Sequence, residues 1–510
     1  MSFDRVYRQS CLARNRVFFA SVLLTALPLF ARAGDSVVRL KVQPMPAPEP
    51  VLQYLLLPEV RELNPGNPAQ WYLRCFAEQR TFFFSKVSVA ERARYLSMPL
   101  AELARATVNQ RQYGGYALGQ ADWAARLDAL DWQVLERVQS DGFSLRQPEL
   151  GPLRVLATAL KVRFRIEVAG RRFDDAVRTA KTMFALARHL GENPTRAANQ
   201  LGLSAAHLAL DALEEMVQQP GCPNLYWALT DLPTPLVDIR KGFQGERSLL
   251  TTELQALRAD AVLSDEELEK VVNRLFGVMS HARMQAGLPP RNLNAGLTAR
   301  TKDAEKIHTI RDRLLQEYLI VLANRRLLPE NRFGLVNRMR GQETARAVFD
   351  RLLELGQAKD LIRKFSPLQV ILLEEKRQFT IHSDERIKLL ALAPWQIDKM
   401  PSEELKRGVK DVLADLLPPV IPARREQGRL EQRFALLRHI EALRLYAADH
   451  EGKLPEKLSD IAVPLPDDPF TGKPFVYRVE GATAHLRGGL PRAEEKSAKY
   501  RNAYEVTLEK

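Results

Sequence analysis

Cysteine is scarce in this chain of 510 residues, and long apolar runs are absent after its N-terminal segment. Cysteine occurs three times, and a chain of this length can bury a core large enough to fold without disulfides. No second stretch of about 18 apolar residues follows the N-terminal one, so we expect no membrane span in the remainder.

Recognisable catalytic motifs are also missing. The sequence has no G-x-S-x-G, phosphate-binding Walker loop, G-x-G-x-x-G or CxxC, and its eight histidines show no HExxH spacing. Adjacent acids such as Glu214-Glu215 point about 100° apart on a helix, which suits a solvated face better than acid/base chemistry. We therefore expect no enzyme and no catalytic or cofactor-binding residues, although distant residues could still assemble the site of an exported hydrolase.

The first 33 residues have the pattern of a cleaved secretory signal. Arginines at positions 5, 8, 14 and 16 precede an apolar run from Val17 to Ala31, which Pro28 interrupts. Ala31-Arg32-Ala33 supplies the small residues that a signal peptidase requires. The sequence predicts a mature chain that begins near Gly34 and is exported to the periplasm or the cell envelope.

The chain is basic, with a formal net charge of +13. Removal of the signal takes away five arginines and one aspartate and leaves about +9. Export and the lack of a nucleic-acid motif argue against nucleic acid as the partner. We expect envelope proteins or polyanionic envelope polymers as partners, or simply a solvated basic surface.

Two cysteines remain after loss of Cys11 with the signal. Cys75 and Cys222 could form one disulfide in an oxidising compartment, or they could stay as two thiols. The sequence leaves both alternatives open.

Helical periodicity dominates the mature chain. Asn67-Pro68 is a helix-start signal, and apolar residues then recur at helical spacing between breaks at Gly170, Gly191 and Pro220. This predicts a mainly α fold, an antiparallel helical-hairpin array resembling an α-solenoid. The expected parts are an extended Pro-rich segment at 34–62, a helical array at 63–284, a loop or hinge at 285–301, a second helical region at 302–425 and a C-terminal module at 426–510.

The C-terminal module is expected to be α+β. Apolar and polar residues alternate at 475–479, 483–486 and 504–508, and Glu480-Gly481 is a hairpin-turn signal. We expect a short antiparallel sheet packed on a helix at 429–450.

The end of the chain resembles the soluble module of type II secretion pseudopilins. The matching residues are Tyr446, Asp449, Gly452, Pro455, Asp468, Pro469, Phe470, Gly472, Pro474 and Tyr477. The resemblance implies a helix followed by a small sheet, and it suggests an accessory of a type II secretion or pilus-like apparatus.

Asp467 and Asp468 lie near the place where such pseudopilins can hold calcium. Oxygen ligands on a loop with glycine suit that cation, although aspartate before proline is also ordinary turn chemistry. Calcium is therefore a candidate cofactor, and a purely structural turn is the alternative.

A second resemblance covers most of the mature chain. Segments 172–195, 209–240 and 391–398, together with DPFTGKPF, resemble uncharacterised exported helical proteins of planctomycete-type bacteria. This resemblance implies compartment and architecture but no activity.

The segment 219–227 concentrates unusual residues and ends in Tyr226 and Trp227. These rings could plug the space between two hairpins, or they could line a groove for a peptide or a glycan. We expect Trp71, Trp123 and Trp132 to lie in the core. The combined prediction is an exported, non-enzymatic scaffold or binding protein, with the secretion accessory and the hydrolase as alternatives.

Overall fold

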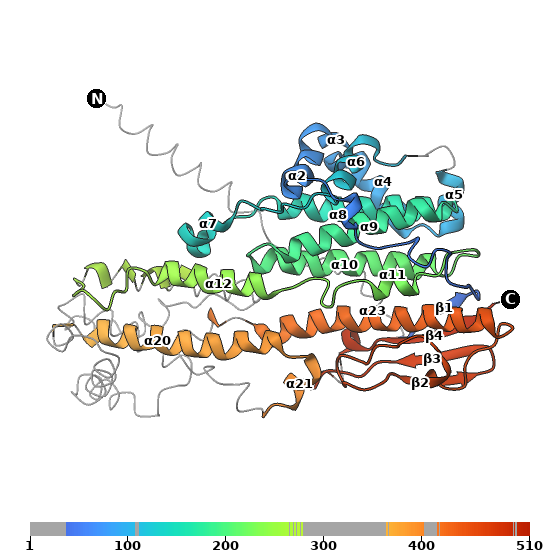
Figure 1. The fold of residues 1–510 in the computed structure, drawn as a ribbon. Helices are drawn as coiled ribbons and strands as arrows, with labels where there is room; N and C mark the ends of the chain where they lie inside the picture. Colours follow the sequence, from blue (N-terminus) through green and yellow to red (C-terminus); the bar gives the residue numbers. More distant parts are fainter. Residues whose placement is uncertain are drawn as a thin grey trace, which may run out of the picture.

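In the computed structural model, stacked layers of helices lie on one small sheet at the C-terminal end (Figure 1). The structure describes residues 37–107, 112–278, 364–401 and 416–509, apart from a few single positions inside these ranges. The predicted signal at 1–33, the predicted hinge at 285–301 and most of the second helical region lie outside the described residues.

Three long helices form the middle layer, and the sequence predicts all of them. Thr195 caps the third by accepting a hydrogen bond from the Ala198 amide, and Asp174 and Asp175 lie in the first turn of the second, where negative charge is favoured. All three helices pack against one another. They are α8 (Leu150–Ala169), α9 (Phe173–Gly191) and α10 (Arg196–Met216).

A layer of shorter helices covers α8 and α9. The first begins as predicted, because the Asn67 side chain accepts a hydrogen bond from the Ala69 amide and Pro68 occupies the first helical position. These helices are α2 (Pro68–Glu78), α3 (Arg80–Phe84), α4 (Lys86–Ser97), α5 (Leu100–Ala106) and α6 (Gly115–Ala124). The short helix α7 (Leu135–Ser140) packs instead against α12 (Arg240–Glu253). Their lengths are irregular, so a regular hairpin array is not confirmed for the part of the chain that the structure describes.

The remaining helices connect this body to the C-terminal end. They are α11 (Tyr226–Thr230), α12 (Arg240–Glu253), α20 (Pro367–Ile387), α21 (Pro394–Lys399) and α23 (Val420–Asp449). Helix α23 packs against α10 and α11 (Figure 1). None of the helices described is long and apolar enough to cross a membrane.

The sheet has four strands in the order β1-β4-β3-β2. The strands are β1 (Val37–Val42), β2 (Val476–Glu480), β3 (Thr483–Arg487) and β4 (Ala503–Leu508). The last three occupy the predicted positions and pair antiparallel. The prediction of a purely antiparallel sheet is wrong, because β1 adds a parallel edge to β4 with Val37 opposite Ala503. The segment that follows the predicted signal is thus part of the fold rather than only a linker.

One hydrophobic core runs from β1 through α8–α10 to α23 and β4. The predicted module at 426–510 therefore shares its core with the helical region.

A buried ion pair on α23 connects three parts of the chain. Arg444 is fully buried and donates to the Glu441 carboxylate at 2.8 Å. Its guanidinium also donates to the carbonyl of Gln43, just after β1, and to that of Cys222, in the turn between α10 and α11. Since a guanidinium loses hydration on burial, these carbonyls stabilise it in place of water.

Arg444→Met should reduce the free energy of unfolding by roughly 3–5 kcal/mol, because the Glu441 carboxylate would stay buried without its cation. Urea unfolding followed by circular dichroism measures the loss. The double variant Arg444→Met/Glu441→Leu should recover most of it. Lys453→Ala, which removes only the exposed pair with Glu451, is the matched control. An Arg444→Met protein as stable as the control would contradict this role.

Candidate functional site

Tyr226, one of the two residues proposed to bind a ligand, is a packing residue in this structure. Its side chain is fully buried, and its hydroxyl donates to the carbonyl of Pro464. The Arg438 guanidinium lies 5.7 Å from the ring centroid. This is the arrangement expected of the plug, here between α11 and α23.

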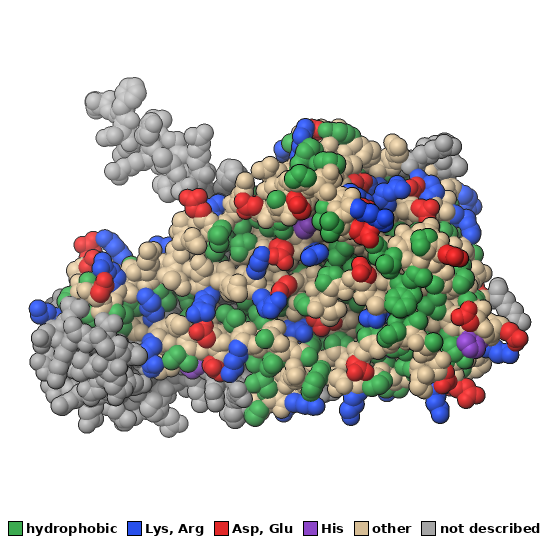
Figure 2. Space-filling model, in the orientation of Figure 1, with side chains coloured by type: hydrophobic (Ala, Val, Ile, Leu, Met, Phe, Trp, Pro, Cys, Tyr) green, Lys and Arg blue, Asp and Glu red, His purple; other side chains and the backbone are tan. Residues whose placement is uncertain are grey.

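Trp227 lies edge-on to Tyr226 with ring centroids 5.1 Å apart, and it is half-buried. Figure 2 shows apolar side chains at the surface over α11. Binding at Trp227 therefore stays a prediction.

Asp467 and Asp468, the predicted calcium ligands, differ in their surroundings. Asp467 is exposed, whereas Asp468 is buried and its carboxylate accepts hydrogen bonds from Gln432 and from the amides of Phe470 and Gly489. These donors close the turn around Asp468. Calcium binding stays a prediction that would require the donors to leave. Among the residues described, no group of three or more His, Cys, Asp or Glu side chains is placed to hold a metal ion.

The two cysteines are separate buried thiols in this structure. Burial raises the pKa of each thiol to about 12. Neither is therefore activated as a nucleophile.

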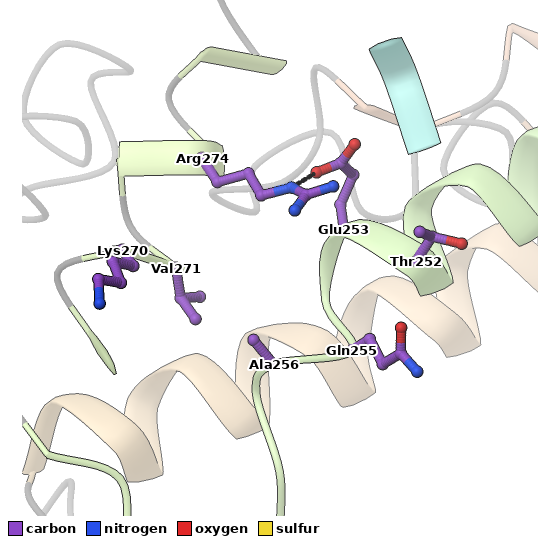
Figure 3. A pocket seen from close by; sticks show the side chains of 7 residues that line it. All are labelled: Thr252, Glu253, Gln255, Ala256, Lys270, Val271 and Arg274. Carbon is purple, nitrogen blue, oxygen red and sulfur yellow. Dashed lines mark hydrogen bonds and ion pairs between the residues drawn. The ribbon is translucent and has the colours of Figure 1, made fainter. Parts of the chain in front are cut away.

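A hollow of about 340 Å³ lies beside the end of α12 (Figure 3). The acid among its lining residues, Glu253, accepts hydrogen bonds from the Phe143 amide at 2.8 Å and from the Arg274 guanidinium. Figure 3 shows Arg274 directed toward this carboxylate. Because both carboxylate oxygens already accept a hydrogen bond, Glu253 serves to position α12 against the 142–144 turn.

A polar network lies between α6, α8 and α9. Arg163 donates to both carboxylate oxygens of Asp122, at 2.6 and 2.9 Å, and to the Thr179 hydroxyl. That hydroxyl donates to Glu167 at 2.6 Å. Burial raises the pKa of Glu167 to about 7, against the opposing charge of Arg163. Sequence reasoning did not identify this group, because the three helices that enclose it come together only in the fold.

Two exposed aromatic side chains lie on α6, beside the half-buried Trp71 of α2. Trp123 is 43% exposed and Tyr116 is 56% exposed. Trp71 packs edge-on against Trp123, with centroids 6.1 Å apart, and the Arg74 guanidinium lies 4.9 Å from the Trp71 centroid. We call Trp71, Arg74, Tyr116 and Trp123 the aromatic surface.

The spacing of residues on α6 explains this arrangement. Tyr116, Gly119 and Trp123 share one face, while Leu118 and Ala121 are buried on the other. A Cβ atom added at Gly119 would meet nothing within 4 Å, so the helix surface between Tyr116 and Trp123 is open at this residue. The expectation that Trp123 lies in the core is wrong. Apolar and polar side chains are hardly segregated around the helix at 115–124, so the sequence carried no clear signal that Trp123 lies outside the core.

Comparison of the chain with protein-family models, with curated proteins and with solved structures found no match. The two resemblances drawn from the sequence stay predictions.

Glu167→Gln should change how stability depends on pH. The folded-state pKa of about 7 lies above the ordinary value of 4.5, so the folded protein keeps a proton that the unfolded chain loses. The stabilisation is complete below pH 4.5 and is lost as the pH rises through 7. Glutamine cannot ionise. The free energy of unfolding of the variant, relative to that of wild type, should therefore rise by roughly 3 kcal/mol between pH 4.5 and 8.

Urea unfolding at a series of pH values measures this difference. Glu136→Gln on α7, which removes an exposed carboxylate, is the matched control. Parallel stability curves for wild type and Glu167→Gln would contradict the assignment.

Proposed function

We propose that the chain is an exported, non-enzymatic binding protein of the bacterial cell envelope, and that the aromatic surface on α2 and α6 contacts its ligand. The supporting observation is the exposure of Trp123 and Tyr116 on one helix face beside Trp71. Large aromatic rings stabilise a fold chiefly when they are buried, and rings grouped at the surface are typical of interaction sites.

The chemistry of the surface favours a glycan that carries acidic groups. The apolar face of a sugar ring packs well on an aromatic ring, and the space at Gly119 leaves both rings accessible. Arg74, now paired with exposed Glu78 at 2.8 Å, can pair with a carboxylate of the ligand instead. Figure 2 shows further Lys and Arg side chains over α4 and α5, which pack on α8 in the same layer of helices.

The position of β1 is compatible with export. Cleavage after Ala33 would remove the predicted signal and leave β1, which begins at Val37, intact in the sheet.

A second candidate function is an accessory of a type II secretion or pilus-like apparatus. The helix α23, the Asp468 turn and the strands β2, β3 and β4 follow one another in the order that the pseudopilin resemblance implies. This order supports the candidate without identifying a partner.

Trp123→Ala and Tyr116→Ala should each weaken binding to isolated peptidoglycan sacculi by about tenfold or more, since a stacked ring is a typical hot-spot contact. Gly119→Leu should weaken it similarly by filling the space between the rings. Co-sedimentation of the mature chain with sacculi measures the affinity.

Leu135→Ala, which truncates an exposed apolar side chain on α7, is the control for these variants. Equal binding by all four proteins and wild type would contradict the proposal. Envelope crosslinking that recovers defined secretion components with wild type and Trp123→Ala alike would favour the second candidate.

The exported chain should begin at Gly34. N-terminal sequencing of protein recovered from the envelope fraction checks this. Ala33→Asp should leave the precursor uncleaved, because signal peptidases require a small neutral residue before the cut. Gly34→Ala is the control, and a chain that keeps its first 33 residues would contradict export by this route.

A further inference from the structure

Strand β2 has an unpaired edge. It pairs with β3 alone, and no other strand, turn or side chain among the described residues pairs with its outer side. Figure 1 shows β2 as the outermost strand of the sheet. An edge of this kind can pair with another strand unless it is covered or carries charges that the other strand does not match.

The hairpin fixes which backbone groups are free. Glu480 and Thr483 flank a two-residue turn, with Gly481 at a φ of +58°, and therefore form a hydrogen-bonded pair. Because hydrogen bonding alternates along a strand, the N–H and C=O groups of Tyr477 and Val479 point away from β3. Free donors and acceptors thus lie at every second residue of this edge.

The side chains on the exposed face of β2 carry charges of opposite sign. Arg478 and Glu480 lie on either side of Val479 and are 67% and 58% exposed, and they pair within the strand at 3.1 Å. When a second copy of the strand runs antiparallel to it about an axis at Val479, each Arg478 faces the Glu480 of the other copy.

We propose that β2 pairs with β2 of a second copy of this chain, antiparallel, about a twofold axis at Val479. Val479 and the partner's Val479 exchange both backbone hydrogen bonds. Arg478 then lies opposite the partner's Glu480 in a position where side chains are closest. The two four-stranded sheets become one continuous sheet.

Charge disfavours the two adjacent registers. A shift that keeps the same backbone groups paired moves the axis to Arg478 or to Glu480. Each of these registers places like charges directly opposite one another, which destabilises a strand pair. Only the register about Val479 pairs opposite charges twice.

The short strand implies a weak dimer, so the test uses sedimentation velocity of the mature chain over a concentration series. Arg478→Glu and Glu480→Arg should each raise the dimer dissociation constant by about tenfold, because both cross-strand pairs become repulsive. The double variant Arg478→Glu/Glu480→Arg restores opposite charges and should return the constant to near the wild-type value.

Arg487→Glu, on the same face but in β3, should leave the dissociation constant unchanged. Thermal unfolding of each variant checks that the monomer remains folded. The proposal is overturned if wild type stays monomeric at every concentration, or if both single reversals dimerise as wild type does.

A disulfide tests the register directly. The proposed pairing places Val479 opposite the partner's Val479 in a hydrogen-bonded pair, whose Cα atoms lie about 5.5 Å apart, within disulfide reach. Val479→Cys should therefore form a covalent dimer on mild oxidation. Tyr477→Cys should not, because this register places the two Tyr477 residues far apart. A Val479→Cys protein that stays monomeric under oxidation would overturn this register.

Discussion

The burial of α23 on several sides is the constraint on which the rest of the structure depends. Its apolar residues Leu436, Ile440 and Leu443 are fully buried in the core that also includes β3 and β4. Its other neighbours are α10 and α11. A helix enclosed in this way cannot hydrate its long basic side chains, so each one has to find partners in the protein.

Two arginines of α23 meet this requirement and thereby join distant parts of the chain. Arg444 holds the segment after β1 and the turn before α11. Arg433 donates to Asp211 and Glu214 of α10, and Tyr504 of β4 donates to the same Glu214 at 2.5 Å. These contacts explain why the helical region and the C-terminal sheet share one core instead of forming two bodies.

The need to pair buried polar groups also distinguishes the structural residues from the candidate binding surfaces. The buried acids at two candidate sites are satisfied inside the fold: Asp468 by three donors and Glu253 by two. The two candidate surfaces consist instead of accessible aromatic rings around Gly119 on α6 and of the backbone edge of β2. Both are suited to contact with a partner.

The sequence by itself determined the local structure. Asn67-Pro68, Gly170 and the alternating residues of 504–508 are signals that act over a few neighbours. A helix begins at the first, a helix ends at the second, and β4 covers the third. Only the tertiary structure decided that β1 joins β4, because pairing Val37 with Ala503 depends on contacts far apart in the chain. It also decided that Tyr226 is buried and Trp123 exposed, since burial depends on which helices meet.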